Sequence, residues 1–320
     1  MNAARFLIAS DAVDTWRDDV LTGNPPTFYR AAESGPLSRI DIGPKLITLI
    51  GGAPGAGKTG FVMQSIVDAL RLSPELKAVV CNIEMPPEVL LDRQLSRLSG
   101  VPLDAIRYRK LTSAHADRID AGLATIETIA DRLCFVRPPF TLANVAATAD
   151  EFSPVGGSGG VVLVLDYIQR IAPPGTQGDK RGQVDLTMNY VRQFADAGAA
   201  VVVVSSVGRQ KDNRGRSSYG GENLSLASFK ESGELEFGAD DAYILAPTNG
   251  GGSILRLQHL KARHRKPESI DLRFYGSTQS FQAIEPPTAE DLSKPDGFQE
   301  ALGELWNETQ PKKRSGPWQP

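Results

Sequence analysis

Apolar residues form short, almost unbroken runs along much of the chain, and segments with helical spacing separate these runs. Residues 46–50, 161–165 and 201–204 are nearly continuous in apolar character rather than alternating, which is typical of strands buried on both faces of a parallel sheet. Between such runs, segments such as 60–72 place apolar side chains three or four residues apart, as a helix with one buried face does. The pattern predicts an α/β fold, with a doubly wound, mostly parallel sheet covered by helices.

The same pattern gives the positions of the expected elements. We expect strands at 46–51, 78–83, 132–136, 161–166, 200–205, 242–246, 254–260 and 270–275. We expect helices at 58–72, 86–99, 113–131, 142–152, 182–197 and 230–237. Because no helical pattern separates the last two strands, they predict an antiparallel hairpin at one edge of the sheet.

Three regions follow from this pattern. Residues 1–44 are an N-terminal extension with a predicted short helix at 12–21, residues 45–285 carry the α/β pattern, and residues 286–320 form a polar tail. Within the tail, residues 297–306 have apolar side chains on one helical side. Such a stripe either packs on its own domain or docks on a partner.

Composition is that of a soluble globular protein, with 41% hydrophobic and 23% charged residues in a chain of 320. We find no apolar run long enough for a membrane span or a signal peptide, and we expect a cytoplasmic location. Cys81 and Cys134 both lie in predicted strands, so we expect them to be reduced core residues. Three histidines and two cysteines make a Cys/His zinc site a poor explanation of the sequence.

The most specific chemical signal lies between the first predicted strand and its helix. Residues 52–59, G-A-P-G-A-G-K-T, match the phosphate-binding loop pattern G-x-x-x-x-G-K-[ST]. Glycines let successive N–H groups point at phosphates, and the helix N-terminus adds partial positive charge. The alternative is a glycine-rich turn that happens to contain Lys-Thr. We therefore predict ATP and Mg²⁺ binding by Gly52, Ala53, Pro54, Gly55, Ala56, Gly57, Lys58, Thr59 and Gly60.

Two carboxylates follow predicted strands. Asp166 ends the strand at 161–166, where it could hold the Mg²⁺ with Thr59 or simply cap the next turn. Glu84 follows the strand at 78–83. It is either a general base for the attacking water or an acidic residue that favours the next helix N-terminus.

Four segments, in order, resemble the motor domain of DnaB-type replicative helicases, which has a RecA-like fold. They cover roughly residues 45–284. They are N-I-E-M-P-P-E-V-L at 82–90 followed by Arg93, D-Y-I-Q at 166–169, E-S-G-E-L-E at 231–236 with A-D at 239–240, and K-A-R at 261–263.

The resemblance implies specific roles. Lys58 and Thr59 would contact phosphate and Mg²⁺, Glu84 would be the catalytic base, and Asp166 would bind the metal. Lys261 and Arg263 would act on the γ-phosphate of the neighbouring subunit, which requires an oligomer. The alternative for this last pair is an exposed, charged strand end.

Two departures limit the resemblance. The family usually carries Ser-Gln after the fourth core strand, where the glutamine senses the γ-phosphate, but Ser205 and Ser206 stand here. The separate N-terminal domain of the family also has no match, so we expect the resemblance to cover the motor domain only. In the rings that this family forms, a short linker helix packs on the adjacent subunit. The predicted helix at 12–21 could be this linker helix.

Residues 208–223 have the composition of a DNA-binding loop or of a merely solvated one. The loop and its flank carry the basic residues Arg209, Lys211, Arg214, Arg216 and Lys230. Such side chains neutralise phosphates without reading sequence. The net charge of −3 does not oppose this, because the local distribution of charge decides binding.

The function predicted from the sequence is therefore an ATP-hydrolysing motor that assembles into a hexameric ring or a filament and moves along or unwinds single-stranded DNA. The alternative is an ATP-dependent regulatory or recombination-type factor that binds nucleic acid without unwinding it. A third hypothesis is a scaffold whose assembly depends on nucleotide and which hydrolyses little ATP. A replication or accessory protein partner is expected, and a membrane is not.

Overall fold

The computed structural model describes residues 8–23, 26–153, 159–173, 180–208, 210–211, 217–218, 224–229, 233–248 and 252–285. Within them the main structure is one nine-stranded sheet, in the order β11-β10-β9-β8-β1-β5-β4-β2-β3. These strands are β1 (Ile47–Gly52), β2 (Lys77–Asn82), β3 (Leu133–Phe135), β4 (Val161–Asp166), β5 (Ala200–Ser206), β8 (Asp241–Pro247), β9 (Ile254–Ala262), β10 (Ile270–Tyr275) and β11 (Ser280–Ala283). A separate two-stranded ribbon joins β6 (Gln210–Lys211) and β7 (Ser217–Ser218).

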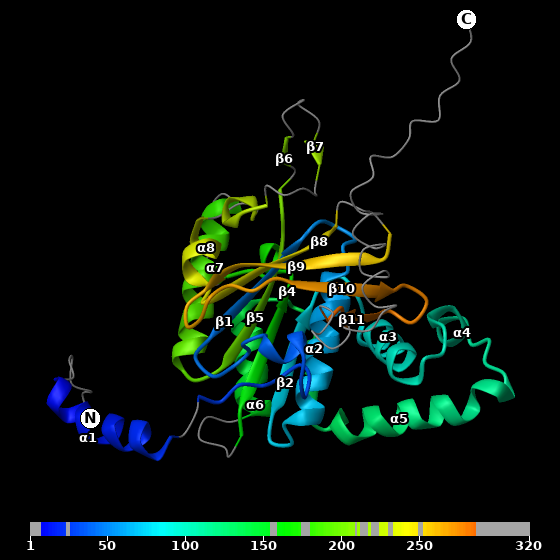
Figure 1. The fold of residues 1–320 in the computed structure, drawn as a ribbon, viewed down its shortest axis with the longest axis horizontal. Helices are drawn as coiled ribbons and strands as arrows, with labels where there is room; N and C mark the ends of the chain where they lie inside the picture. Colours follow the sequence, from blue (N-terminus) through cyan, green and yellow to red (C-terminus); the bar gives the residue numbers. More distant parts are fainter. Residues whose placement is uncertain are drawn as a thin grey trace, which may run out of the picture.

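Helices lie on both faces of the sheet (Figure 1). They are α1 (Ala9–Thr22), α2 (Lys58–Leu72), α3 (Pro87–Ser99), α4 (Leu103–Arg107), α5 (Ala116–Ala130), α6 (Leu142–Phe152), α7 (Lys180–Asp196) and α8 (Gly233–Gly238). Short 3-10 turns are η1 (Pro36–Arg39), η2 (Ser113–His115), η3 (Ile168–Arg170) and η4 (Leu226–Ser228).

Two apolar layers enclose the sheet. On one face, α2, α3 and α5 contribute residues such as Phe61, Leu90 and Ile129 to a core that also holds Val80 and Val164. On the other face, α6, α7 and α8 pack against the alternate residues of the same strands. The continuous apolar runs of the sequence therefore belong to strands buried on both sides, and the predicted doubly wound α/β fold is confirmed.

Strand direction changes across the sheet. The pairs β3–β2, β2–β4, β4–β5, β5–β1 and β1–β8 are parallel, whereas β8–β9, β9–β10 and β10–β11 are antiparallel. The predicted edge hairpin is confirmed as β9–β10. It extends by β11, which the sequence pattern does not predict because a four-residue strand is too short to show a clear periodicity.

Most element predictions agree with the structure. The predicted limits of β4, α2 and α6 match the observed ones. The helix predicted at 113–131 is instead η2 followed by α5, and α4 was not predicted. The helix predicted at 297–306 lies outside the described residues.

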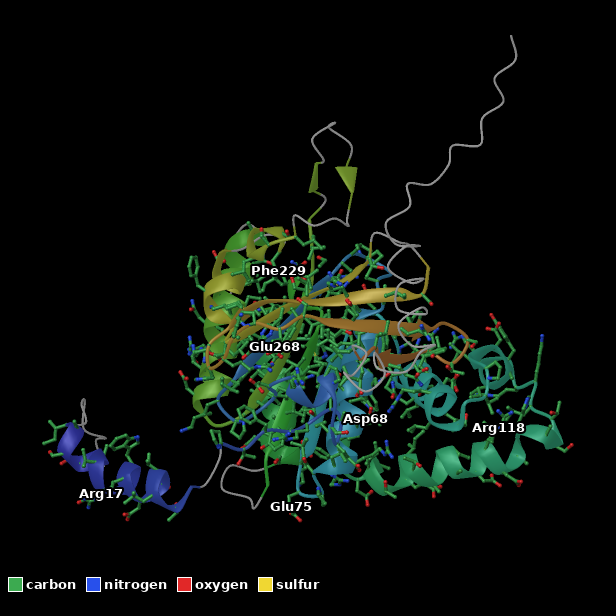
Figure 2. All side chains as sticks on the ribbon, viewed as in Figure 1. Arg17, Asp68, Glu75, Arg118, Phe229 and Glu268 are labelled. Atoms are coloured by element: carbon green, nitrogen blue, oxygen red, sulfur yellow. The ribbon has the colours of Figure 1, made fainter. Side chains whose placement is uncertain are left out.

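Two parts project from the sheet at opposite ends of the molecule's long axis. Figure 1 shows α1 on the side of the N-terminus, and α4 with the adjoining end of α5 on the other side. Side chains fill the space between the sheet and its helices, while the Arg17 side chain on α1 stands apart from them (Figure 2). In the described part of the chain, no helix has both the length and the apolar character that crossing a membrane requires.

Candidate functional site

The loop between β1 and α2 has the backbone that phosphate binding needs. Gly55 and Gly57 have φ angles of 78° and 89°, in the left-handed region that glycine adopts without strain. A Cβ at Gly57 would also lie 2.9 Å from Cζ of Phe281. The N–H of Phe61 donates to the Gly57 carbonyl at 2.9 Å. Because α2 begins at this loop, its first free N–H groups face the space that the loop encloses.

Lys58 folds over the same loop. Its Nζ donates to the carbonyls of Gly52 and Ala53, each at 2.9 Å. Burial lowers the pKa of Lys58, while the carboxylates of Asp166 and Glu84 raise it. Lys58, Asp166 and Glu84, which are far apart in sequence, are therefore close enough to interact electrostatically.

Asp166 is a buried carboxylate beside this loop. Burial raises its pKa from 3.8 to about 6, a hydrogen bond from Thr59 opposes that rise, and the charge of Glu84 adds to it. The Thr59 hydroxyl and the Asp166 carboxylate thus place two oxygen atoms next to each other, and oxygen atoms are the ligands that Mg²⁺ prefers. Their chemistry fits the predicted metal ion.

Asn82 organises this site, although no motif in the sequence assigns it a role. It ends β2 directly beside Asp166 in the parallel register. Its Nδ2 donates to Oδ2 of Asp166 at 2.7 Å, and its Oδ1 accepts from the N–H groups of Glu84 at 3.1 Å and Met85 at 2.8 Å. One amide therefore fixes both the buried carboxylate and the turn that presents the exposed Glu84. A strand-end asparagine next to Ile-Glu-Met was the available signal.

The loop predicted to bind DNA starts and ends at this edge of the sheet. Val207 pairs with Phe229, and the Gly208 N–H donates to the Ser228 carbonyl at 2.8 Å. The Phe229 ring packs on Gly51, where an added Cβ would clash with the ring. Figures 1 and 2 show the β6–β7 ribbon beyond the sheet, above Phe229. Of the predicted DNA-binding residues, only the backbone of Lys211 is described, while Arg209, Arg214, Arg216 and Lys230 lie outside the described residues.

A glutamine occupies this edge, although not from the expected strand. Ser206 lies beside Gly52 in the register of β1 and β5, where the family pattern has a glutamine. From η3, Gln169 Nε2 donates to the Ser205 hydroxyl at 2.7 Å. The Gln169 side chain therefore connects the turn after Asp166 to the end of β5.

Lys261 and Arg263 lie at the opposite edge of the sheet. β9 runs antiparallel to β8, so Ala262 pairs with Asp241 at the start of β8, whereas Gly52 at the loop pairs with Leu245 near its end. Arg263 Nη1 lies 2.6 Å from Oδ1 of Asp240, and Lys261 Nζ donates to the Phe237 carbonyl at 3.1 Å. The structure therefore does not bring these two cations to Lys58 of the same chain.

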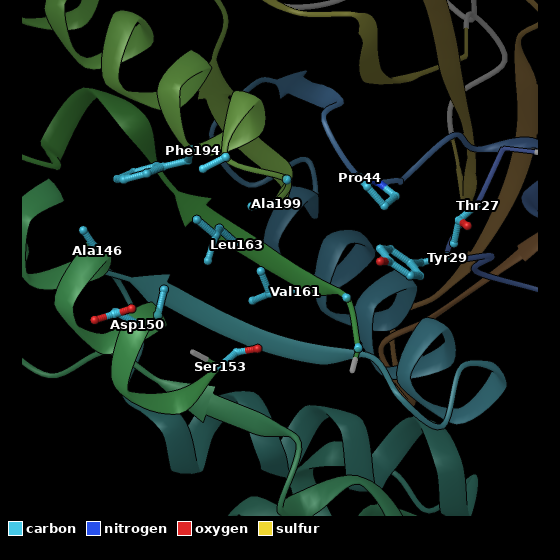
Figure 3. A pocket seen from close by; sticks show the side chains of 15 residues that line it. Thr27, Tyr29, Pro44, Ala146, Asp150, Ser153, Val161, Leu163, Phe194 and Ala199 are labelled. Atoms are coloured by element: carbon cyan, nitrogen blue, oxygen red, sulfur yellow. The ribbon is translucent and has the colours of Figure 1, made fainter. Parts of the chain in front are cut away.

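A cavity of about 540 Å³ lies beside the first residues of β4 and the residues just before β5 (Figure 3). Tyr29, Asp150, Val161, Phe194 and Ala199 are among the residues that line it. None of the described lining residues is a lysine, an arginine or a histidine. The cavity lies at the edge away from Lys58, and none of residues 52–59 is among its described lining residues.

Comparison with known proteins decides the family. The family model described as "DnaB-like helicase C terminal domain" matches residues 42–283. The chain belongs to this family. Membership in the DnaB-like family implies an NTP-hydrolysing domain that binds nucleotide with a metal ion.

Solved structures share the fold of this DnaB-like domain. A structure described as an ATPase domain is similar with a TM-score of 0.73 and 16% identity, over 87% of this chain and 99% of that one. A DnaB-like replicative helicase, solved in a study of its interactions with primase, is similar with a TM-score of 0.75 and 16% identity, over 87% of this chain and 69% of that one. At this identity the likeness establishes the RecA-like fold alone.

The raised pKa of Asp166 gives a stability prediction for the nucleotide-free DnaB-like domain. Because the folded-state pKa of about 6 exceeds the ordinary 3.8, the folded state binds this proton more tightly than the unfolded state does. The resulting stabilisation is present at low pH and is lost as pH rises through about 6. Between about pH 7.5 and about pH 5, the wild-type protein should gain about 1 kcal/mol relative to Asp166→Asn, measured by denaturant unfolding at both pH values. Identical pH dependence of the two proteins would contradict the assignment.

Proposed function

We propose that this chain is an ATP-hydrolysing, ring-forming motor of the DnaB-like helicase type, which translocates on or unwinds DNA by binding a single strand. One observation carries the proposal. Lys58, Asp166 and Glu84 gather at the carboxyl edge of the sheet, whereas Lys261 and Arg263 lie at the amino edge. Because one copy holds these sets apart, a second copy must supply the cations if they act on the same phosphate.

We assign roles on this basis. The backbone of residues 52–60 and the Lys58 ammonium bind the phosphates of ATP, and Thr59 and Asp166 hold Mg²⁺, which supplies charge neutralisation at those phosphates when bound. Glu84 accepts a proton from the attacking water. Its exposure supports this role, because water must reach the base. Lys261 and Arg263 of the neighbouring copy stabilise charge on the transferred phosphoryl group.

Helix α1 supports the assembly. Val13, Trp16 and Val20 share one side of the helix, are exposed, and include a tryptophan that is 63% exposed. The other side is acidic, with Asp11, Asp14, Asp18 and Asp19 against the single Arg17. A helix of this kind needs a partner that is both apolar and basic.

Residues 107–111 offer such a surface, which we call the α4 surface. Tyr108 and Leu111 are 63% and 43% exposed, and Arg107, Arg109 and Lys110 surround them. Asp92 pairs with both arginines and offsets only part of this charge. Because α1 and the α4 surface lie at opposite ends of the molecule (Figure 1), we propose that α1 of one copy packs on the α4 surface of the next, in a hexameric ring or a filament.

Serine at position 206 favours the alternative of a regulatory or recombination-type ATPase that binds nucleic acid without unwinding. A hydroxyl lacks the reach of a glutamine amide, so coupling of hydrolysis to the loop 208–223 would depend on other groups. Gln169, which bonds Ser205, is one such group. A directional unwinding assay separates the two functions, because DNA-stimulated ATPase activity without strand separation supports only the alternative. The partner in either case would be a replication or accessory protein.

The first test addresses the chemistry. Lys58→Ala should reduce ATPase activity by about 100-fold or more, because it removes the cation that offsets phosphate charge. Glu84→Gln should retain ATP affinity but lose turnover, since the amide cannot accept the proton. Equilibrium ATP binding and steady-state phosphate release measure the two properties separately. Near wild-type turnover by Glu84→Gln would exclude Glu84 as the base.

The second test addresses assembly. Trp16→Asp should raise the concentration needed for assembly by about tenfold or more, because it removes the largest apolar contact of α1. Sedimentation velocity with a non-hydrolysable ATP analogue measures this. Arg17→Ala, on the same helix, is the matched control and should not weaken assembly, because it keeps the apolar side chains and removes a cation from a helix whose proposed partner is basic. If both variants assemble normally, α1 is not the contact.

The third test addresses the nucleic acid. Replacing Arg214 and Arg216 with alanine should weaken single-strand binding and reduce the slope of log affinity against log salt by about 1.4. Basal ATPase activity should stay nearly constant, because the nucleotide site is untouched. Alanine at the exposed Arg30 and Arg137 is the matched control for lost charge. Wild-type protein without salt-sensitive affinity for single-stranded DNA would overturn the helicase proposal.

A further inference from the structure

The carboxylate of Asp240 lies buried next to Arg263 and Arg192 at the amino edge of the sheet. Asp240 is fully buried, at 0% exposure. Its Oδ1 lies 2.6 Å from Nη1 of Arg263, and its Oδ2 lies 3.1 Å from Nη2 of Arg192 on α7. One carboxylate therefore connects an arginine of α7 with an arginine that follows β9.

The main chain fixes this carboxylate. The Ile47 N–H donates to Oδ2 of Asp240 at 2.8 Å, and the Asp240 N–H donates to the Ile47 carbonyl at 2.8 Å. Arg192 Nη2 also donates to the Gly238 carbonyl at 2.5 Å. The side chain of Asp240 is thus held against the first residue of β1, at the end opposite to the phosphate-binding loop, and cannot rotate without losing several hydrogen bonds.

Arg263 is held from one side and open on the other. Its side chain is 50% exposed although its Nη1 forms an ion pair with Asp240. A guanidinium has five N–H donors, so this contact leaves donors for an external anion. Asp240 carries one negative charge and shares it with Arg192, and Lys261 lies nearby, so the cluster retains positive charge. The pKa of Lys261 is lowered by burial and further by Arg263, which reflects this crowding of cations.

We propose that Asp240 is a positioning residue, which together with Arg192 holds Arg263 in the direction of the phosphates bound by the neighbouring copy. The inference rests on the proposed function, since it requires Arg263 to act in trans. A guanidinium that is already oriented loses less conformational entropy when it meets a phosphate than a free side chain does. Asp240 therefore contributes to the rate of hydrolysis without touching ATP.

The test is a kinetic comparison in assembled protein with single-stranded DNA. Asp240→Asn, which keeps the size of the side chain but removes its charge, should lower kcat for ATP by about tenfold or more and change KM by less than about threefold, because the nucleotide site of each copy is unaltered. Arg192→Gln should lower kcat in the same direction by a smaller factor. Wild-type kcat in Asp240→Asn would overturn the inference.

Mixing experiments exclude a loss of folding as the cause. Asp240→Asn protein has an intact nucleotide site but a poorly held Arg263, whereas Lys58→Ala protein has a defective nucleotide site but a well-held Arg263. Mixing them should therefore restore ATPase activity above the sum of the two proteins alone. Mixing Asp240→Asn with Arg263→Ala should restore none, because neither supplies a good Arg263. Recovery in this second mixture, or none in the first, would contradict the positioning role.

Two controls keep the possible failures apart. Asp241→Asn changes the next residue, also buried, whose carboxylate contacts His259 at 3.0 Å, and kcat per assembled protein should match the wild type. If kcat of Asp241→Asn were reduced as much as that of Asp240→Asn, the effect would be non-specific and the inference would be overturned.

If Arg263→Ala keeps wild-type kcat, the trans role in the proposed function is wrong. If Arg263→Ala is impaired and rescued by Lys58→Ala protein while Asp240→Asn is fully active, only the Asp240 inference is wrong.

Discussion

The position of β1 in the middle of the sheet is the constraint on which the site depends. This strand is hydrogen-bonded to β5 on one side and β8 on the other, and all six of its residues are buried. Its carboxyl end leads into the candidate phosphate-binding loop, and the N–H of Ile47 at its amino end donates to Asp240. A strand of this length separates its ends by about 20 Å. The two sets of candidate catalytic groups are therefore held apart by the core itself, and the proposed chemistry would require a second copy.

Two buried carboxylates mark the two edges, and their surroundings differ in a way that matches the roles we propose. Asp166 receives hydrogen bonds from Thr59 and Asn82 but forms no ion pair shorter than 4.0 Å in the described part of the chain, so burial dominates and its pKa rises to about 6. A carboxylate in this condition favours the arrival of a cation. Asp240 is instead compensated by two arginines. It is suited to holding a cation in place rather than to recruiting one.

The sequence predicted the sheet, which the structure confirms, and also a candidate nucleotide site, because the signals for both are local. Buried parallel strands have to be continuously apolar, and the loop at 52–59 needs its glycines and its lysine at fixed spacing. The contacts of Asn82, Gln169 and Asp240 depend on strand register and on side chains up to 84 residues apart, which no local pattern encodes. The short β11 and α4 were not predicted for a different reason, since four or five residues are too few to show a periodic pattern. The resemblance to DnaB-type helicases predicted Lys261 and Arg263 as a pair, but only the antiparallel register of β9 places them at the far edge.

The measurement that tests this account most directly is electron microscopy of the wild-type protein with a non-hydrolysable ATP analogue and single-stranded DNA. The account predicts a closed ring or a filament in which the edge carrying Asp240 and Arg263 in one copy faces the loop 52–59 of the next, with nucleotide between them. A monomer under these conditions, or an assembly in which nucleotide is bound and those two edges do not meet, would contradict it.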